Sequence, residues 1–478
     1  MKTLETSQPG FAEAWAKLCA RGSEEDEGPV REAAARLVAE VRARGDAALV
    51  ELTERFDGWK PASPAALAFG PSDFEAAFAG LPAAGRKALT VAAGRIEAFH
   101  RREIDAEVPA FTDRSGATLA QVTRPLGKVG VYAPGGTARY PSTILMTAIP
   151  ARVAGVGEVV ACSPGVKGTG EVDAWTLAAC HVAGVARLFR VGGAQAVAAL
   201  AYGTATIPAV DKICGPGNAY VAAAKRIVFG QVDIDMIAGP TEVVVVAGPK
   251  ADPAEAASDL LAQAEHDVRA VAVLLTPSAK LAVAVGAEVA RQLETLPRRE
   301  IAARSIEERG ALVVTADVAE AIRLADAFAP EHLALLLPDA QRWVKKISRA
   351  GAVFAGTNTP EAVGDYVAGP SHVLPTAGTA RFASPLSVAT FRRRMSVLDL
   401  SPAALAEVAP AVEALAAAEG FEGHARAVRI RVEAQKAAVR PATPRPRRNA
   451  VERTSGRSAQ RGRKTASARA RGRKVAAP

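Results

Sequence analysis

The chain has 478 residues, 49% of them apolar, so it is too long for one ordinary core and several layered units are expected. Its four cysteines lie far apart with no Cys-x-x-Cys pair, which argues against a disulfide framework or a thiolate zinc site and fits a reducing cytoplasm. The amino-terminal sequence lacks the apolar core of a signal peptide, and no apolar stretch approaches the roughly 20 residues that span a membrane. We therefore expect a soluble, cytoplasmic protein with no membrane partner.

The net charge of +9 is concentrated at the carboxyl end of the chain. Residues 440–478 hold thirteen Lys and Arg against one acid, a net +12, which leaves −3 for residues 1–439. Large apolar side chains are almost absent there, so we expect residues 438–478 to form a disordered basic tail. The tail has no aromatic residue for base stacking, so any contact with a polyanion should be non-specific and sensitive to salt.

In chain order, residues 9–103 are predicted to be helical, and short apolar runs then alternate with helical stretches. Such alternation is typical of a parallel sheet covered by helices. The first series has predicted strands at 129–132, 158–162, 188–191, 212–214 and 232–234, with helices near 142–154, 171–183, 193–202 and 217–229. The second has strands at 243–247, 270–275, 312–315, 333–337 and 353–355, with helices near 253–266, 278–294, 317–328 and 339–349.

This pattern predicts an α/β fold of two consecutive doubly wound, Rossmann-like units with mainly parallel sheets. The expected parts are a helical segment at 1–22, a discontinuous α/β domain of 23–128 with 243–388, a second α/β domain at 129–242, a carboxyl-terminal helical arm at 389–437 and the tail. The two series have a similar layout, which suggests a duplicated architecture.

Histidine is rare in this chain, and four of the six stand in short polar motifs: His266, His332, His372 and His424. Histidine suits both proton transfer near neutral pH and metal ligation. Gln263 and His266 are three apart on a predicted helix, so both can meet one cation, although a solvated polar helix end also explains the pair.

Two further polar motifs stand near predicted strands. Asp365 adjoins Gly364 in a segment that we expect to be an irregular loop, where its carboxylate is either a ligand or a turn-forming cap. Glu331 and His332 precede a predicted strand and can serve two separate proton transfers. The plainer interpretation is a satisfied histidine at a strand edge.

Three glycine-rich loops follow predicted strands in the first series: Tyr132-Ala-Pro-Gly-Gly136, Gly192-Gly-Ala-Gln195 and Gly215-Pro-Gly-Asn218. Loops of this kind at strand ends define a crevice that can hold a ligand. The last is a weak nucleotide signal, because Tyr220 occupies the third glycine position of the dinucleotide fingerprint. Cys214 adjoins this loop, and we interpret it as a packing residue rather than a thiohemiacetal nucleophile.

Taken together, these motifs resemble the histidinol dehydrogenase family over about residues 20–435. The resemblance rests on ten ordered motifs: Tyr132-x-Pro-Gly-Gly, Pro141-Ser-Thr, Gly192-Gly-Ala-Gln-Ala, Gly215-Pro-Gly-Asn, Ala238-Gly-Pro-Thr-Glu, Gln263-Ala-Glu-His-Asp, Pro330-Glu-His-Leu, Gly364-Asp-Tyr, His372-Val-Leu-Pro-Thr and Ser384-Pro-Leu-Ser-Val. It implies oxidation of L-histidinol to L-histidine through histidinaldehyde, with two NAD+ and one zinc ion.

The resemblance also implies roles for particular residues. Zinc would be bound by Gln263, His266, Asp365 and His424, and the acid/base pair would be Glu331 and His332. Substrate contacts would come from Thr241, His372, Glu419, His332 and the zinc ligands, and NAD contacts from Tyr132, Gln195 and Asn218, which places NAD on the 129–242 domain. The family is homodimeric with shared active sites, so Glu419 and His424 would come from the neighbouring subunit.

Two departures from the family pattern affect the substrate side. Thr241 replaces the usual serine but keeps the hydroxyl, and Pro370-Ser371 replaces a Thr-Asn pair before the histidine. An alternative function is therefore a dehydrogenase on the same scaffold that oxidises another alcohol, such as a sulfonated diol; retention of His372 and Glu419 favours histidinol. A nucleic-acid-binding function driven by the tail does not explain the histidine motifs.

Overall fold

The structure, a computed structural model, describes residues 1–21, 28–104, 108–135 and 140–439. The predicted loop residue Gly136 and the basic tail from Arg440 onward lie outside the described residues. The chain divides into two compact units, Met1–Phe111 with Leu119–Val397 and Thr112–Thr118 with the chain from Leu398 on. No described helix is both long enough and apolar enough to cross a membrane.

The first sheet of the larger unit has the strand order β2-β7-β6-β5-β8-β9. All neighbours are parallel except β2, which runs antiparallel to β7. The order reverses between β5 and β8, as in doubly wound folds. The strands are β2 (Ala68–Phe69), β5 (Lys128–Tyr132), β6 (Glu158–Cys162), β7 (Arg187–Phe189), β8 (Lys212–Cys214) and β9 (Asp233–Ile234).

Helices cover both faces of this sheet. Side chains alternate along a strand, so Val131 packs into one core and Tyr132 into the other. The first core includes α4 (Pro71–Gly80), α5 (Ala83–His100), α6 (Pro141–Ala154) and α7 (Ala174–Ala183). The second includes α2 (Gly28–Arg44), α3 (Asp46–Asp57), η2 (Pro64–Leu67), α8 (Gly193–Tyr202) and α9 (Ala219–Val228).

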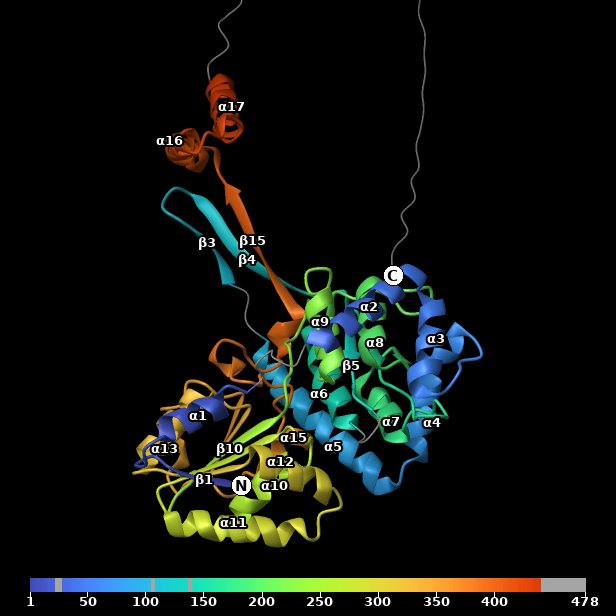
Figure 1. The fold of residues 1–478 in the computed structure, drawn as a ribbon. Helices are drawn as coiled ribbons and strands as arrows, with labels where there is room; N and C mark the ends of the chain where they lie inside the picture. Colours follow the sequence, from blue (N-terminus) through green and yellow to red (C-terminus); the bar gives the residue numbers. More distant parts are fainter. Residues whose placement is uncertain (22–27, 105–107, 136–139, 440–478) are drawn as a thin grey trace, which may run out of the picture. The chain divides into compact units, whose positions relative to one another are not determined.

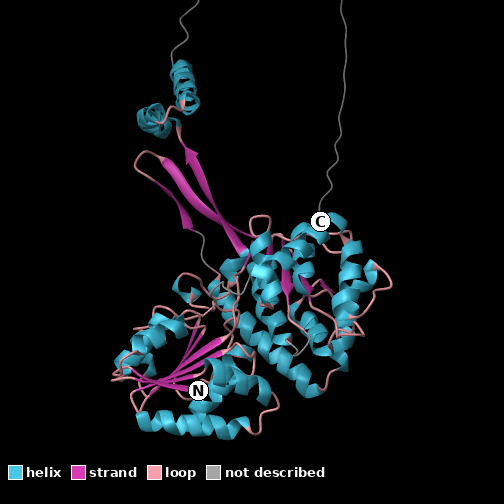
Figure 2. Ribbon diagram, viewed as in Figure 1, coloured by secondary structure: helices cyan, strands magenta, loops and turns pink. Residues whose placement is uncertain are grey.

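The second sheet is wholly parallel, with the order β1-β12-β11-β10-β13-β14. Its strands are β1 (Lys2–Glu5), β10 (Glu242–Ala247), β11 (Val271–Thr276), β12 (Ala311–Val314), β13 (His332–Leu336) and β14 (Ala352–Ala355). One face carries α10 (Pro253–Ala264), α11 (Ala279–Leu293) and α12 (Arg299–Arg309), and the other carries α1 (Phe11–Cys19) and α13 (Val318–Phe328) (Figure 1). The short helix α14 (Ala340–Val344) packs in the same core as α1 and α13. The strands lie between these helical layers (Figure 2).

The predicted fold class is confirmed, because two mainly parallel sheets are each covered by helices on both faces. The duplicated layout is also seen in the topology. From β5 and from β10, five successive strands take the same spatial order, third, second, first, fourth, fifth.

The predicted division into domains is wrong at the amino-terminal side. We expected residues 23–128 to share a core with 243–388, but α2 to α5 pack in the two cores of the first sheet. Residues 1–19 instead join the second sheet, where β1 pairs with β12 and Trp15 packs against Phe328. The segment predicted to be purely helical therefore begins with a strand, whose edge position and partial exposure leave little apolar signal.

The carboxyl-terminal arm also differs from the prediction. We expected helices over 389–437, but η5 (Val388–Phe391) leads into β15 (Arg392–Leu400) before α16 (Pro402–Ala418) and α17 (Glu422–Val439). β15 lies in a three-stranded sheet of order β15-β4-β3, with β4 (Ala117–Pro125) and β3 (Val108–Thr112). The remaining short elements are η3 (Arg101–Glu103), α15 (Glu361–Tyr366) and η4 (Thr379–Arg381).

Candidate active site

The candidate acid/base pair lies at the amino end of β13. His332 is the first residue of this strand and pairs in register with Val243 of β10, at the place where the strand order of the second sheet reverses. Glu331 is 7% exposed and His332 is 3% exposed. Two titratable groups are thus held inside the protein, where an unpartnered polar group is costly and a reactive one is shielded from bulk water.

The Glu331 carboxylate is held by two donors from the start of β10. Its Oε2 accepts hydrogen bonds from Thr241 Oγ1 at 2.6 Å and from the Glu242 backbone N–H at 3.0 Å. Burial nevertheless raises the pKa of Glu331 well above its usual range. A raised pKa makes the carboxylate a stronger proton acceptor.

The His332 imidazole is fixed by the same strand. Its Nδ1 lies 3.1 Å from the backbone carbonyl oxygen of Glu242 and donates to it in the Nδ1–H tautomer. Nε2 then carries the free lone pair, on the side where Asp365 Oδ1 lies 3.9 Å away. Burial lowers the pKa of His332 to about 3, so the ring is neutral and keeps a lone pair.

Gln263 ends the last turn of α10, fully buried beside this pair. In one orientation its side-chain amide nitrogen donates to Thr241 Oγ1 at 2.6 Å. In the reversed orientation the nitrogen donates to Glu361 Oε1 at 2.9 Å and, when the ring carries its proton on Nε2, to His332 Nδ1 at 2.8 Å, and the oxygen accepts from Thr241. In the reversed orientation the amide connects the hydroxyl of Thr241 with the imidazole of His332.

Asp365 lies on the short helix α15, and the prediction of an irregular loop is wrong. Its backbone carbonyl lies 3.0 Å from His372 Nδ1, and its Oδ1 lies 3.9 Å from the same nitrogen. Burial raises the pKa of Asp365 to about 6 and lowers that of His372 to about 4. The helix passes unnoticed in the sequence because it is one and a half turns long and contains Gly364, against which the ring of Phe354 packs closely.

His266 lies just beyond the end of α10, after the C-cap residue Glu265. Its pKa is lowered by burial and, to a smaller extent, by the charge of Arg298. Arg298 Nε donates to the backbone carbonyl of Glu265 at 2.8 Å, and this contact fixes the chain that carries the imidazole. His266 also lowers the pKa of His332 and of His372, so the three rings are electrostatic neighbours.

The larger unit therefore brings together seven of the predicted site residues: Thr241, Gln263, His266, Glu331, His332, Asp365 and His372. Glu419 and His424 belong to the smaller unit, where both are exposed and His424 packs on Phe421 with ring centroids 5.3 Å apart. Their predicted place beside the other residues stays a prediction.

The donors present fit a zinc ion in their chemistry. Neutral imidazole and carboxylate are ordinary zinc ligands, and burial lowers the pKa of His266, which favours the neutral ring. The carboxyl end of α10 adds partial negative charge, which favours a cation. Within the described ranges no three His, Cys, Asp or Glu side chains are grouped to hold a metal ion. The predicted ligand set contributes only His266 and Asp365 of these types from the larger unit, together with the amide of Gln263.

The predicted NAD residues follow the carboxyl ends of strands in the first sheet: Tyr132 and Asn218 stand beside the reversal point between β5 and β8, and Gln195 follows β7. The Tyr132 hydroxyl at the end of β5 accepts from the Gly193 N–H at 3.0 Å, and burial raises its pKa to about 12. Gln195 is buried on α8, and Asn218 caps α9 by accepting from the N–H groups of Tyr220 and Val221. The start of α9, which follows β8 at the strand reversal, is where a doubly wound fold receives a nucleotide.

Sequence models of protein families and known relatives give one consistent result. The model described as histidinol dehydrogenase matches residues 20–432. The chain belongs to the histidinol dehydrogenase family. Its members are dehydrogenases, and the chain is therefore an oxidoreductase.

Individual relatives support this assignment over most of the chain. The histidinol dehydrogenase of Cupriavidus pinatubonensis is 48% identical over 434 residues, 90% of this chain and 97% of the relative. That of Cereibacter sphaeroides is 51% identical over 432 residues, 90% of this chain and 98% of the relative. The crystal structure of histidinol dehydrogenase from Elizabethkingia anophelis has a TM-score of 0.85 and 32% identity, and covers 91% of this chain and 99% of that one.

Sequence reasoning missed Glu361, which is 1% exposed and reaches the amide of Gln263. Glu361 stands four residues before Asp365 on α15, and this spacing places both carboxylates on the same face of the helix. The sequence also gives no sign of the contacts that Glu242, the last residue of the motif Ala238-Gly-Pro-Thr-Glu, makes with Glu331 and His332. Cys214 is fully buried and burial raises its thiol pKa well above the usual range, which fits the packing interpretation.

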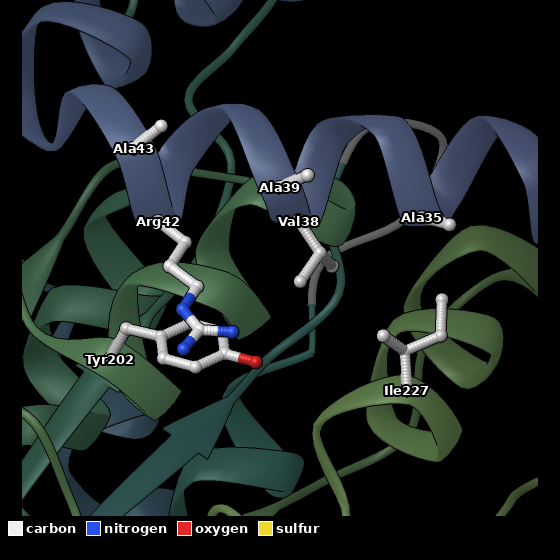
Figure 3. A pocket seen from close by; sticks show the side chains of 7 residues that line it. All are labelled: Ala35, Val38, Ala39, Arg42, Ala43, Tyr202 and Ile227. Atoms are coloured by element: carbon white, nitrogen blue, oxygen red, sulfur yellow. The ribbon is translucent and has the colours of Figure 1, made fainter.

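A separate surface groove of about 450 Å³ lies between α2, α8 and α9 (Figure 3). The Arg42 guanidinium lies over the ring of Tyr202, 4.9 Å from its centroid. The other lining side chains are small or apolar: Ala35, Val38, Ala39, Ala43 and Ile227. None of the predicted site residues lines this groove.

Proposed function

We propose that the chain oxidises L-histidinol to L-histidine in two steps through histidinaldehyde, with one zinc ion per subunit and NAD+, at the end of histidine biosynthesis. The observation that carries the proposal is the buried, neutral His332 beside Glu331, within reach of the amide of Gln263 and the carboxylate of Asp365. A base, a second proton carrier and nitrogen and oxygen donors thus share one interior site.

The cofactors supply chemistry that the side chains lack. NAD+ supplies a hydride acceptor, and zinc supplies a positive centre for the imidazole and amine of the substrate. In the Nδ1–H tautomer, His332 donates to the carbonyl of Glu242, and its Nε2 takes the hydroxyl proton in the first oxidation. This contact fixes the ring orientation, so the Nε2 lone pair is already directed for proton transfer and less entropy is lost in reaching the transition state.

Glu331 serves the second oxidation. Its raised pKa and its two donors, Thr241 and the Glu242 N–H, hold a proton acceptor where water can hydrate the aldehyde. Separate groups for the alcohol proton and for water allow one site to perform both oxidations without releasing the aldehyde.

The proposal includes a cytoplasmic homodimer in which each active site takes Glu419 and His424 from the neighbouring subunit. Support comes from the smaller unit, which presents several large apolar side chains with exposures above half: Leu398, Leu415, Phe421 and Ile430. Apolar side chains so exposed suit burial against a partner chain. Contact of the basic tail with polyanions remains a separate prediction.

The test is the yield of NADH from L-histidinol. One site performing both oxidations should give two NADH and one histidine per substrate, with little free aldehyde. Chelation should abolish turnover and added zinc should restore it, since zinc affinity depends on a full ligand set. One NADH with aldehyde released, activity that survives complete metal removal, or a higher kcat/KM for a sulfonated diol would each contradict the proposal.

A further inference from the structure

Arg21 and Glu242 form a buried ion pair next to the candidate acid/base pair, and neither residue was among the predicted site residues. Arg21 Nε and Nη2 donate to the two carboxylate oxygens of Glu242, at 2.8 and 2.7 Å. The two side chains are only 6% and 1% exposed. A bidentate arginine–carboxylate pair removed from water has one favoured geometry, and losing either partner leaves a buried charge.

Arg21 also holds the chain that leads into the acid/base pair. Its Nη2 donates to the backbone carbonyls of Phe328 at 2.7 Å and Ala329 at 3.3 Å. Its guanidinium stacks on the Phe328 ring, 3.4 Å from the centroid. Ala329 has a left-handed backbone with φ of 52°, which a non-glycine residue adopts only where its surroundings hold it. Glu331 follows two residues later.

Glu242 links Arg21 to the acid/base pair. Its backbone N–H donates to Glu331 and its backbone carbonyl oxygen lies 3.1 Å from His332 Nδ1, while its side chain is held by Arg21. Glu242 Oε1 also accepts from the N–H of Ala377, at 2.6 Å. One residue thus contacts both members of the acid/base pair through its backbone, and its position is fixed through its carboxylate.

We propose that Arg21 is a positioning residue for the oxidation. Its guanidinium is hydrogen-bonded both to the carboxylate of Glu242 and to the carbonyls of Phe328 and Ala329. These bonds fix the positions of Glu331 and His332 relative to β10. The inference rests on the proposed function. Arg21 contacts neither member of the pair, and all of its action passes through Glu242 and the chain before Glu331. Displacement of a reacting group by about 1 Å can cost on the order of 10²-fold in rate.

The first experiment compares Arg21→Met with Arg21→Lys. Arg21→Met should lower kcat about 10- to 100-fold, while KM for L-histidinol and NAD+ stays within about three-fold of the parent, because a misplaced pair slows chemistry more than binding. Arg21→Lys keeps the charge but lacks the fork, so it should recover part of kcat. Zinc content should be unchanged, because Arg21 touches none of the predicted ligands.

A control with the same pairing away from the site, at a more exposed arginine, is Arg187→Met. Arg187 also pairs with a glutamate, Glu158, at 3.0 Å and lies over a phenylalanine ring, Phe189, at the amino end of the other sheet. It should leave kcat within two-fold of the parent. If Arg21→Met and Arg21→Lys also retain kcat within two-fold, measured below their unfolding temperatures, the positioning role is refuted.

The double variant Arg21→Met/Glu242→Gln separates positioning from stability. It leaves no unpaired buried charge, so it should unfold at a higher temperature than Arg21→Met alone. Its kcat should stay low, because the fork that fixes Glu242 is gone. Recovery of kcat together with stability would show that the ion pair acts on folding alone and would overturn the inference.

A direct readout keeps this test independent of the proposed substrate. The chain has six histidines, so ¹⁵N-histidine labelling resolves few ring signals. Arg21→Met should shift the His332 ring signals and leave those of His100 and His181 in place. An unmoved His332 signal overturns the positioning role even in a protein that oxidises another alcohol. An inactive parent with a shifted His332 signal would count against the proposed function alone.

Discussion

At the scale of single residues, the polar motifs predicted much of the candidate site because each is local in sequence. Glu331 with His332 and Gln263 with His266 stand within three positions of each other, and folding brings both motifs to the ends of β10 and β13. The pairing of Arg21 with Glu242 could not be found in this way, because 221 positions separate them and only the fold brings them into contact.

The division of labour between Glu331 and His332 leads to a prediction at this scale. His332→Asn should slow alcohol oxidation, because the hydroxyl proton loses its acceptor, and Glu331→Gln should mainly slow aldehyde oxidation, because water activation is lost. Each effect should be about 10²- to 10⁴-fold, the usual contribution of a general acid or base. Supplying histidinaldehyde directly isolates the second step. Equal effects of Glu331→Gln on both steps would contradict the assignment.

At the scale of elements, buried strands were predicted best. β6 and β8 have the predicted bounds, since strands covered on both faces are largely apolar and here only the first residue, Glu158 or Lys212, is charged. β15 was missed because its sequence, RRRMSVLDL, is largely exposed and polar at its start. Which sheet α2 to α5 would cover was also beyond the sequence, because an amphipathic helix shows that it has a buried face but not which core receives it.

The loop after β8 leads to a prediction about an element. Gly215 has φ of 110°, and a Cβ there would collide with the carbonyl oxygen of Tyr132. Gly230 has a similar φ of 100° but nothing within 4 Å of its Cβ position. Gly215→Ala should therefore displace the loop between Tyr132 and Asn218, two predicted NAD contacts, and raise KM for NAD+ at least about ten-fold. Gly230→Ala should only lower the free energy of unfolding, by about 1–2 kcal/mol of backbone strain. Steady-state kinetics and thermal unfolding measure the two effects, and equal KM values for both variants would contradict the role of this loop.

At the scale of the whole molecule, the sequence predicts a body of charge −3 with a tail of +12, and the site residues divide between two compact units. Deleting residues 440–478 should leave histidinol turnover unchanged, because every predicted site residue lies at or before His424. The same deletion should remove any salt-sensitive affinity for polyanions.

The proposed supply of Glu419 and His424 by the neighbouring subunit can be tested with mixed dimers. His332→Asn and His424→Asn should each inactivate a homodimer, since one removes the base and the other a predicted zinc ligand. If His424 is supplied by the neighbouring subunit, a mixed dimer collects both lesions in one site and none in the other. Mixing the two variants under conditions of subunit exchange should therefore restore activity, up to one intact site per mixed dimer. Exchange is followed by native mass spectrometry of the two variants carrying different tags. Exchange without recovery would mean that each active site is built from a single chain.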